Sequence, residues 1–136
     1  MMVAVAAAAF AAARASTTYK GKTSQRNPVS LRTDNDGSAV RSFTIRREFD
    51  CGAQTAEGTF RQDSGKMVIK PDGRFFGHAE VNPAPGGEIR RGQFTIRGRF
   101  GERGGAARGT YRERVRLRNG NRCDTGEIRY RVKAQG

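Results

Sequence analysis

The sequence lacks tryptophan and contains little cysteine, proline or histidine. Its 136 residues include no Trp, two Cys, four Pro and one His. The one histidine, His78, has no nucleophile-elbow motif to accompany it, so Ser-His-Asp catalysis is not indicated. The two cysteines lie far apart, whereas zinc ligands come in close pairs. We therefore predict a protein that is not an enzyme and that holds neither a cofactor nor a metal.

Acidic residues are also scarce. Thirteen Asp and Glu stand against 26 Lys and Arg, so the formal net charge is +13, and arginine supplies 21 of the basic residues. A charge of this size attracts polyanions and disfavours self-association. The alternative is that a gene of high GC content has placed arginine on solvated faces without any selected partner.

Only the N-terminus has a long apolar run. Val3–Ala13 is nearly all alanine, and Ala13-Arg14-Ala15 fits the small-x-small pattern before a cleavage point at Ser16. This is the shape of a secretory signal peptide, and it is shorter than the roughly 20 residues that span a bilayer. We predict a signal peptide over 1–15, a single β domain over 16–136, and a secreted or cell-envelope location. Because no Lys or Arg precedes the run, an Ala-rich tail is the alternative.

After the N-terminus, side chains alternate in short runs and no amphipathic 3.6-residue period is present. The segments Asp34–Gly37 and Lys70–Gly73 carry turn residues. The pattern predicts an all-β domain of about eight strands, an antiparallel β-sandwich or small β-barrel, after an N-terminal signal helix. The expected strands are 17–24, 29–33, 40–49, 54–61, 67–69, 74–81, 93–100, 110–118 and 127–133.

Cys51 and Cys123 each lie next to the end of an expected strand. In an exported protein, an even pair of cysteines is most simply a disulfide. We predict this bond, which would tie the middle of the chain to its last strand.

Two neighbouring strands, 93–100 and 110–118, have one apolar face and one basic face. Phe94, Ile96 and Phe100 share a side with Gly98, and arginines occupy the other side. The predicted anion-binding residues on the basic face are Arg97, Arg99, Arg112, Arg114, Arg116, Arg118, Arg129 and Arg131.

The expected partners of this face are anionic lipid, cell-wall polymer or acidic polysaccharide. No aromatic residue is expected among these arginines, so nucleic acid would be bound only non-specifically. The alternative is a solvated face that keeps a β-protein soluble and blocks edge-to-edge aggregation.

Two charged residues, Arg47 and Glu113, fall on the apolar sides of their strands. A charge that points inward needs a partner or water. They form a buried pair with each other or line a ligand cavity, unless a β-bulge or a position at a barrel mouth turns them outward.

Several short motifs support a family resemblance: Tyr19–Gln25 with Pro28–Leu31, and Cys123–Tyr130 preceded by 98–100 and 109–111. Together they resemble uncharacterised small exported β-proteins of high-GC actinobacteria, a group with no assigned activity or ligand. The resemblance implies export, a Cys51–Cys123 disulfide and an all-β fold, and it implies no functional residues.

The function predicted from the sequence is a non-catalytic exported β-module whose basic face binds anionic surfaces or polymers. One alternative is a small-molecule-binding β-barrel with Arg47 and Glu113 in its cavity. Another is a cytosolic nucleic-acid-binding protein, which would apply if residues 1–15 are not a signal peptide.

Overall fold

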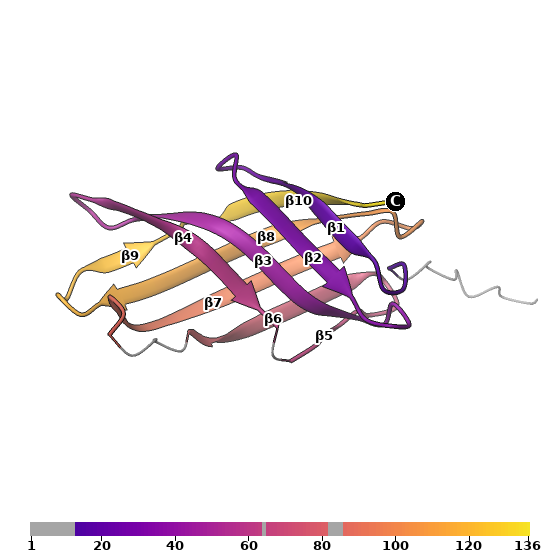
Figure 1. The fold of residues 1–136 in the computed structure, drawn as a ribbon, viewed down its shortest axis with the longest axis horizontal. Helices are drawn as coiled ribbons and strands as arrows, with labels where there is room; N and C mark the ends of the chain where they lie inside the picture. The colour runs from indigo at the N-terminus through magenta and orange to yellow at the C-terminus, as the bar shows by residue number, and fades with distance from the viewer. Residues whose placement is uncertain (1–12, 64, 82–85) are drawn as a thin grey trace, which may run out of the picture.

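The fold is all-β, as the sequence predicts. The computed structural model describes residues 13–63, 65–81 and 86–136, and these contain ten strands and no helix (Figure 1). The predicted signal helix falls largely on residues 1–12, which lie outside the described residues. The strands are β1 (Thr18–Thr23), β2 (Pro28–Thr33), β3 (Ala39–Asp50), β4 (Thr55–Gln62), β5 (Met67–Val68), β6 (Arg74–Val81), β7 (Ile89–Phe100), β8 (Ala106–Leu117), β9 (Arg122–Asp124) and β10 (Ile128–Ala134).

Six of the strands close into an antiparallel barrel, in the order β1-β2-β3-β9-β8-β10 and back to β1. Strands β4 and β5 extend the outer edge of β3, while β7 and β6 extend that of β8. The barrel is flattened, so that β1–β4 lie in front of β10, β8, β7 and β6 (Figure 1). The sandwich and the barrel predicted as alternatives are thus combined in one fold.

The core fills the space between these layers, because alternate residues of each strand point inward. On β3, Phe43 and Ile45 are fully buried, as are Ile96 on β7 and Tyr111 on β8. The rings of Phe43 and Tyr111 stack with centroids 6.0 Å apart. These residues lie on the sides that the sequence pattern assigned to the interior.

Two glycines let large aromatic residues cover the inner side of the β6–β7–β8–β10 layer. Gly98 and Gly109 are paired across β7 and β8, and Phe75 and Tyr130 are their outer partners on β6 and β10. A Cβ at Gly98 would lie 2.0 Å from the Phe75 ring and 2.6 Å from the Tyr130 hydroxyl. The Tyr130 hydroxyl donates a hydrogen bond to the Arg97 carbonyl at 2.7 Å. A larger residue at Gly98 would therefore displace this inner layer.

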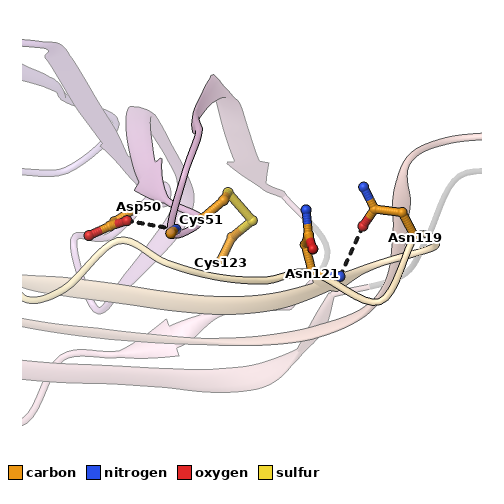
Figure 2. The surroundings of a disulfide bond; sticks show 6 residues. Asp50, Cys51, Asn119, Asn121 and Cys123 are labelled. Carbon is orange, nitrogen blue, oxygen red and sulfur yellow. Dashed lines mark hydrogen bonds between the residues drawn. A yellow bond between two sulfur atoms is a disulfide. The ribbon is translucent and has the colours of Figure 1, made fainter.

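The disulfide lies where the two layers meet at one end of the barrel (Figure 2). Cys51 follows β3, and Cys123 is the middle residue of β9, which the sequence analysis did not predict as a strand. The predicted bond between them is present, and Cys123 is buried beside Phe49 and Val115. Asp50 Oδ1 accepts a hydrogen bond from the Gly52 N–H at 2.9 Å, which shapes the turn after β3.

Residues that precede the predicted cleavage point contact the barrel. Ala13 is 5% exposed, and the Arg14 N–H donates to the Tyr19 hydroxyl at 2.9 Å. The Thr33 hydroxyl donates to the Arg14 carbonyl. Cleavage after Ala15 stays a prediction, and it would remove these contacts while leaving all ten strands intact. No helix in the described residues is long and apolar enough to cross a membrane.

Candidate functional site

A row of five basic side chains crosses the outer face of the β6–β7–β8–β10 layer and continues onto β1. The backbone register pairs Lys22 with Arg131, Arg131 with Arg108, Arg108 with Arg99, and Arg99 with Arg74. All five residues are exposed. We call Lys22, Arg131, Arg108, Arg99 and Arg74 the cationic row. Because neighbouring strands lie about 4.8 Å apart, the five positive charges are held close together.

Little negative charge balances the cationic row. Asp72 pairs with Arg74 at 3.4 Å and accepts from Arg99 Nε through its backbone carbonyl at 3.2 Å. In the described part of the chain, the other four members form no ion pair within 4 Å. Like charges directly opposite each other on neighbouring strands destabilise a sheet. Repulsion within the cationic row therefore destabilises the folded protein, and a bound anion would relieve it.

A groove of about 1040 Å³ runs beside the cationic row. Its lining includes Gly98 and Gly109, which lie between the cationic row and a second lateral row. This second row, which we call the mixed row, consists of Arg129, Thr110, Arg97 and Phe76. Lys70 also lines the groove, and among the described residues no Asp or Glu does so. We call this feature the cationic groove.

The mixed row corrects one expectation from the sequence, which placed no aromatic residue among the arginines. Phe76 is paired with Arg97 in register, and the Arg97 guanidinium carbon lies 5.6 Å from the centroid of the Phe76 ring. Phe76 is 54% exposed. The expectation was wrong because it considered only β7, β8 and β10, and the aromatic residue comes from β6.

No protein-family model, curated protein or solved structure matches this chain.

Four of the eight predicted arginines, those at 97, 99, 129 and 131, line the cationic groove. Arg112 and Arg114 lie farther along β8, outside the groove, and both pair with Asp124 on β9. Arg112 Nη2 lies 2.9 Å from an Asp124 carboxylate oxygen, and Arg114 Nε lies 3.4 Å from the same atom. The hydrogen bonds between them raise the pKa of Arg112 and lower the pKa of Asp124. The positive charge of the predicted face is therefore partly offset near its middle.

Arg116 belongs to a second cationic region at the other end of β8. It is in register with Arg91 on β7 and Arg122 on β9, and we call these three residues the distal row. Repulsion from Arg122, followed by that from Arg91, lowers the pKa of Arg116. The last predicted arginine, Arg118, donates through Nε to the Gly87 carbonyl at 2.6 Å, so it helps to hold the start of β7.

Arg47 and Glu113 meet inside the barrel. Arg47 Nε donates to Glu113 Oε1 at 2.7 Å, and Arg47 Nη2 donates to Glu113 Oε2 at 3.0 Å. The Tyr111 hydroxyl donates to Glu113 Oε1 as well. Glu113 is fully buried, and the Arg47 guanidinium lies over the rings of Phe49 and Phe60. Arg47 on β3 and Glu113 on β8 therefore point into the core, as the alternation of side chains along these strands predicted.

The surroundings of this pair also shift its proton affinities. Burial alone would lower the pKa of Arg47, but the hydrogen bonds and charge of Glu113 outweigh it and raise that pKa above the usual value. Burial, together with the negative charge of Glu113, raises the pKa of Tyr111. Among the described residues, no buried side-chain nitrogen or oxygen lacks a hydrogen-bond partner. The polar groups of the pair are thus satisfied within the protein.

Half of the basic residues in the groove are not among the eight arginines predicted from the sequence: Lys22, Lys70, Arg74 and Arg108. Arg108 lies outside the expected strand 110–118, whereas β8 begins at Ala106. Alternation from Phe75 does place Arg74 on the outer side, so that residue could have been found. Lys22 could not, because its position depends on the pairing of β1 with β10.

Proposed function

We propose that this chain is a non-catalytic β-module that binds anionic polymers in its cationic groove. The cationic row is the observation that carries this proposal. Five basic side chains stand in register across five strands, and only one of them has a carboxylate partner among the described residues. A bound polyanion would relieve the repulsion within the row, and counterion release would add to the affinity.

The shape of the site favours a linear polymer over a flat surface. The groove lies between two rows of side chains and runs across the strands, so a chain lying in it meets cations along one whole side. Arginine presents planar guanidinium donors that match phosphate, sulfate and carboxylate oxygens. A concave surface of one charge sign also concentrates anions from solution.

The test replaces Arg99 and Arg108 together by serine. Both residues are exposed, so the fold should be retained, and the row loses its central charge and one neighbouring charge. We expect affinity for a polyanion such as inorganic polyphosphate to fall at least about tenfold. The slope of log affinity against log salt should become shallower by about two units, one for each lost contact.

The matched control is the double variant Arg32→Ser and Arg41→Ser. It removes the same net charge from exposed positions on β2 and β3, in the other layer. We expect this control to keep most of the wild-type affinity. Equal losses in both double variants would show that only net charge matters, and the groove would then have no special role.

We also propose that the protein acts outside the cytoplasm. The disulfide supports this, because such bonds persist mainly in oxidising compartments. The measurement is the intact mass of the protein from its native host, with and without reduction and alkylation. We expect a chain that starts at Ser16 and has two protected thiols. A full-length chain with free thiols would contradict both export and the disulfide.

A further inference from the structure

The described surface exposes two large apolar side chains, and one of them lies in the cationic groove. These residues are Val68, at 68% exposure, and Phe76, at 54%. Val68 is on the short edge strand β5, whereas Phe76 is on β6 and lines the groove. An exposed phenyl ring beside cations is suited to a ligand that has both flat apolar groups and negative charge.

Phe76 is held in a defined place by its neighbours. Arg97, its partner in register on β7, contacts the ring as a cation–π pair, and the backbone carbonyl of Arg97 is fixed by the Tyr130 hydroxyl. The Arg97 guanidinium and the Phe76 ring are both planar. Together they offer flat surfaces on which a planar group can stack. These surfaces lie at the β6 end of the mixed row, and Arg74 lies across the groove at the β6 end of the cationic row.

We propose that the groove binds single-stranded nucleic acid, with phosphates on the cationic row and an unpaired base stacked at Phe76 and Arg97. This rests on the proposed function and adds the identity of the polymer. Proteins that hold single strands without sequence preference combine a basic groove with aromatic side chains on an exposed sheet. Binding is expected to be sequence-tolerant, because every base has a π-face.

Other polyanions match only part of this site. Polyphosphate can satisfy the cationic row but has no ring to place at Phe76. Acidic polysaccharides have puckered, saturated rings, which lack the flat π-face that a nucleobase offers to both a guanidinium plane and a phenyl ring. A duplex keeps its bases stacked inside, so it cannot present one to the groove. The combination of charge and flat rings therefore favours single strands.

The experiment measures binding of the full chain to three ligands at one fixed salt concentration: an oligothymidylate of about eight nucleotides, within the range of known single-strand sites, the corresponding duplex, and inorganic polyphosphate. The variant is Phe76→Ala, on an exposed position where unfolding is not expected. We expect its affinity for the oligothymidylate to fall by about 5- to 150-fold, the range for one stacked base. Its affinity for polyphosphate should stay within twofold of wild type.

The control is Val68→Ala, which trims the other exposed apolar residue and should change neither affinity. Unchanged oligothymidylate binding by Phe76→Ala, with binding still lost in the Arg99/Arg108 variant, would overturn the nucleic-acid proposal and leave the proposed function intact. So would tighter binding of the duplex than of the single strand. If no ligand binds in a manner that depends on Arg99 and Arg108, the proposed function itself fails.

Discussion

At the scale of single residues, the ion pair inside the barrel is the feature in which each charge most needs its partner. Arg47 and Glu113 form two parallel hydrogen bonds, and Tyr111 donates a further one. Such a pair adds little net stability, because removing two charges from water offsets their attraction. Breaking it is costly, since the remaining charge stays buried. The pair therefore fixes how β3 and β8 face each other across the core.

The first prediction concerns Glu113→Gln. This change keeps the side-chain shape but leaves the Arg47 charge buried without its partner, so the free energy of unfolding should fall by about 3–5 kcal/mol. Adding Arg47→Met should restore part of the loss, because no buried charge remains. Denaturant unfolding monitored by circular dichroism measures both effects.

The matched control for this prediction is Glu57→Gln. Glu57 pairs with Arg46 at 3.0 Å on the exposed side of β3 and β4. An exposed pair contributes about 0–1 kcal/mol, so this variant should unfold almost as the wild type does. If Glu113→Gln were as stable as the control, the buried pair would have no structural role.

A second prediction at the scale of single residues concerns the loss of stability at low pH. Burial alone would raise the pKa of Asp34, but its interactions with Asp36, Lys66 and the Ala39 N–H outweigh burial and lower that pKa from 3.8 to about 2. The unfolded chain therefore binds a proton at Asp34 at higher pH than the folded chain does. The contribution of Asp34 is fully present above about pH 4 and is lost as the pH falls through 2.

We therefore expect the Asp34→Asn variant to lose less stability than the wild type between about pH 5 and pH 2. Thermal unfolding at several pH values measures this difference. Asp63→Asn is the control, because Asp63 is an exposed carboxylate that pairs only loosely with Arg61, at 3.3 Å. Parallel pH profiles for wild type and Asp34→Asn would contradict the role of Asp34 in acid sensitivity.

At the scale of strands, β9 is the element most dependent on a single covalent bond. It has three residues, and one register pair joins it to β3. The Cys51–Cys123 disulfide links positions 72 residues apart, for which the chain-entropy account gives a stabilisation of roughly 4 kcal/mol. β9 also carries Asp124, which holds Arg112 and Arg114.

We predict that Cys51→Ala with Cys123→Ala lowers the free energy of unfolding by roughly 4 kcal/mol. The backbone amides of β9 should also exchange hydrogen faster than those of β7 and β8, because the three residues of β9 pair with β8 on one edge and keep a single register pair with β3 on the other. Hydrogen exchange with mass spectrometry reports both regions in one experiment. A wild-type unfolding midpoint that does not change with reductant would contradict this prediction.

Strands are also the scale at which the sequence was most informative. Alternation placed Ile96, Tyr111 and even Glu113 on the inner face, because the two-residue period of a strand is a local property. The three-residue β9 was missed, since a strand of that length has no period to detect. The pairing of β1 with β10 was also not predictable, because it joins segments more than 100 residues apart. Lys22 joins the cationic row only through that pairing, so this member of the row could not be predicted.

At the scale of the whole molecule, positive charge is divided into two regions on one outer face. The cationic groove lies at one end of β8, and the distal row of Arg91, Arg116 and Arg122 lies at the other. From Arg108 to Arg116 the distance is about 27 Å, at about 3.4 Å per strand residue. Asp124 lies between them and pairs with two arginines, whose combined charge it partly offsets. A ligand that reaches both regions must pass this carboxylate.

The last prediction follows from this position. Asp124→Asn should free Arg112 and Arg114 for a ligand while keeping an oxygen that can accept the Gly126 N–H bond. A polyanion longer than about 27 Å should then bind more tightly, with a salt slope steeper by about one to two units. A short polyanion confined to the cationic groove should bind as before. Asp63→Asn changes the net charge equally and should affect neither ligand. If the short ligand gained as much as the long one, Asp124 would act only through net charge, and the two regions would not form one binding face.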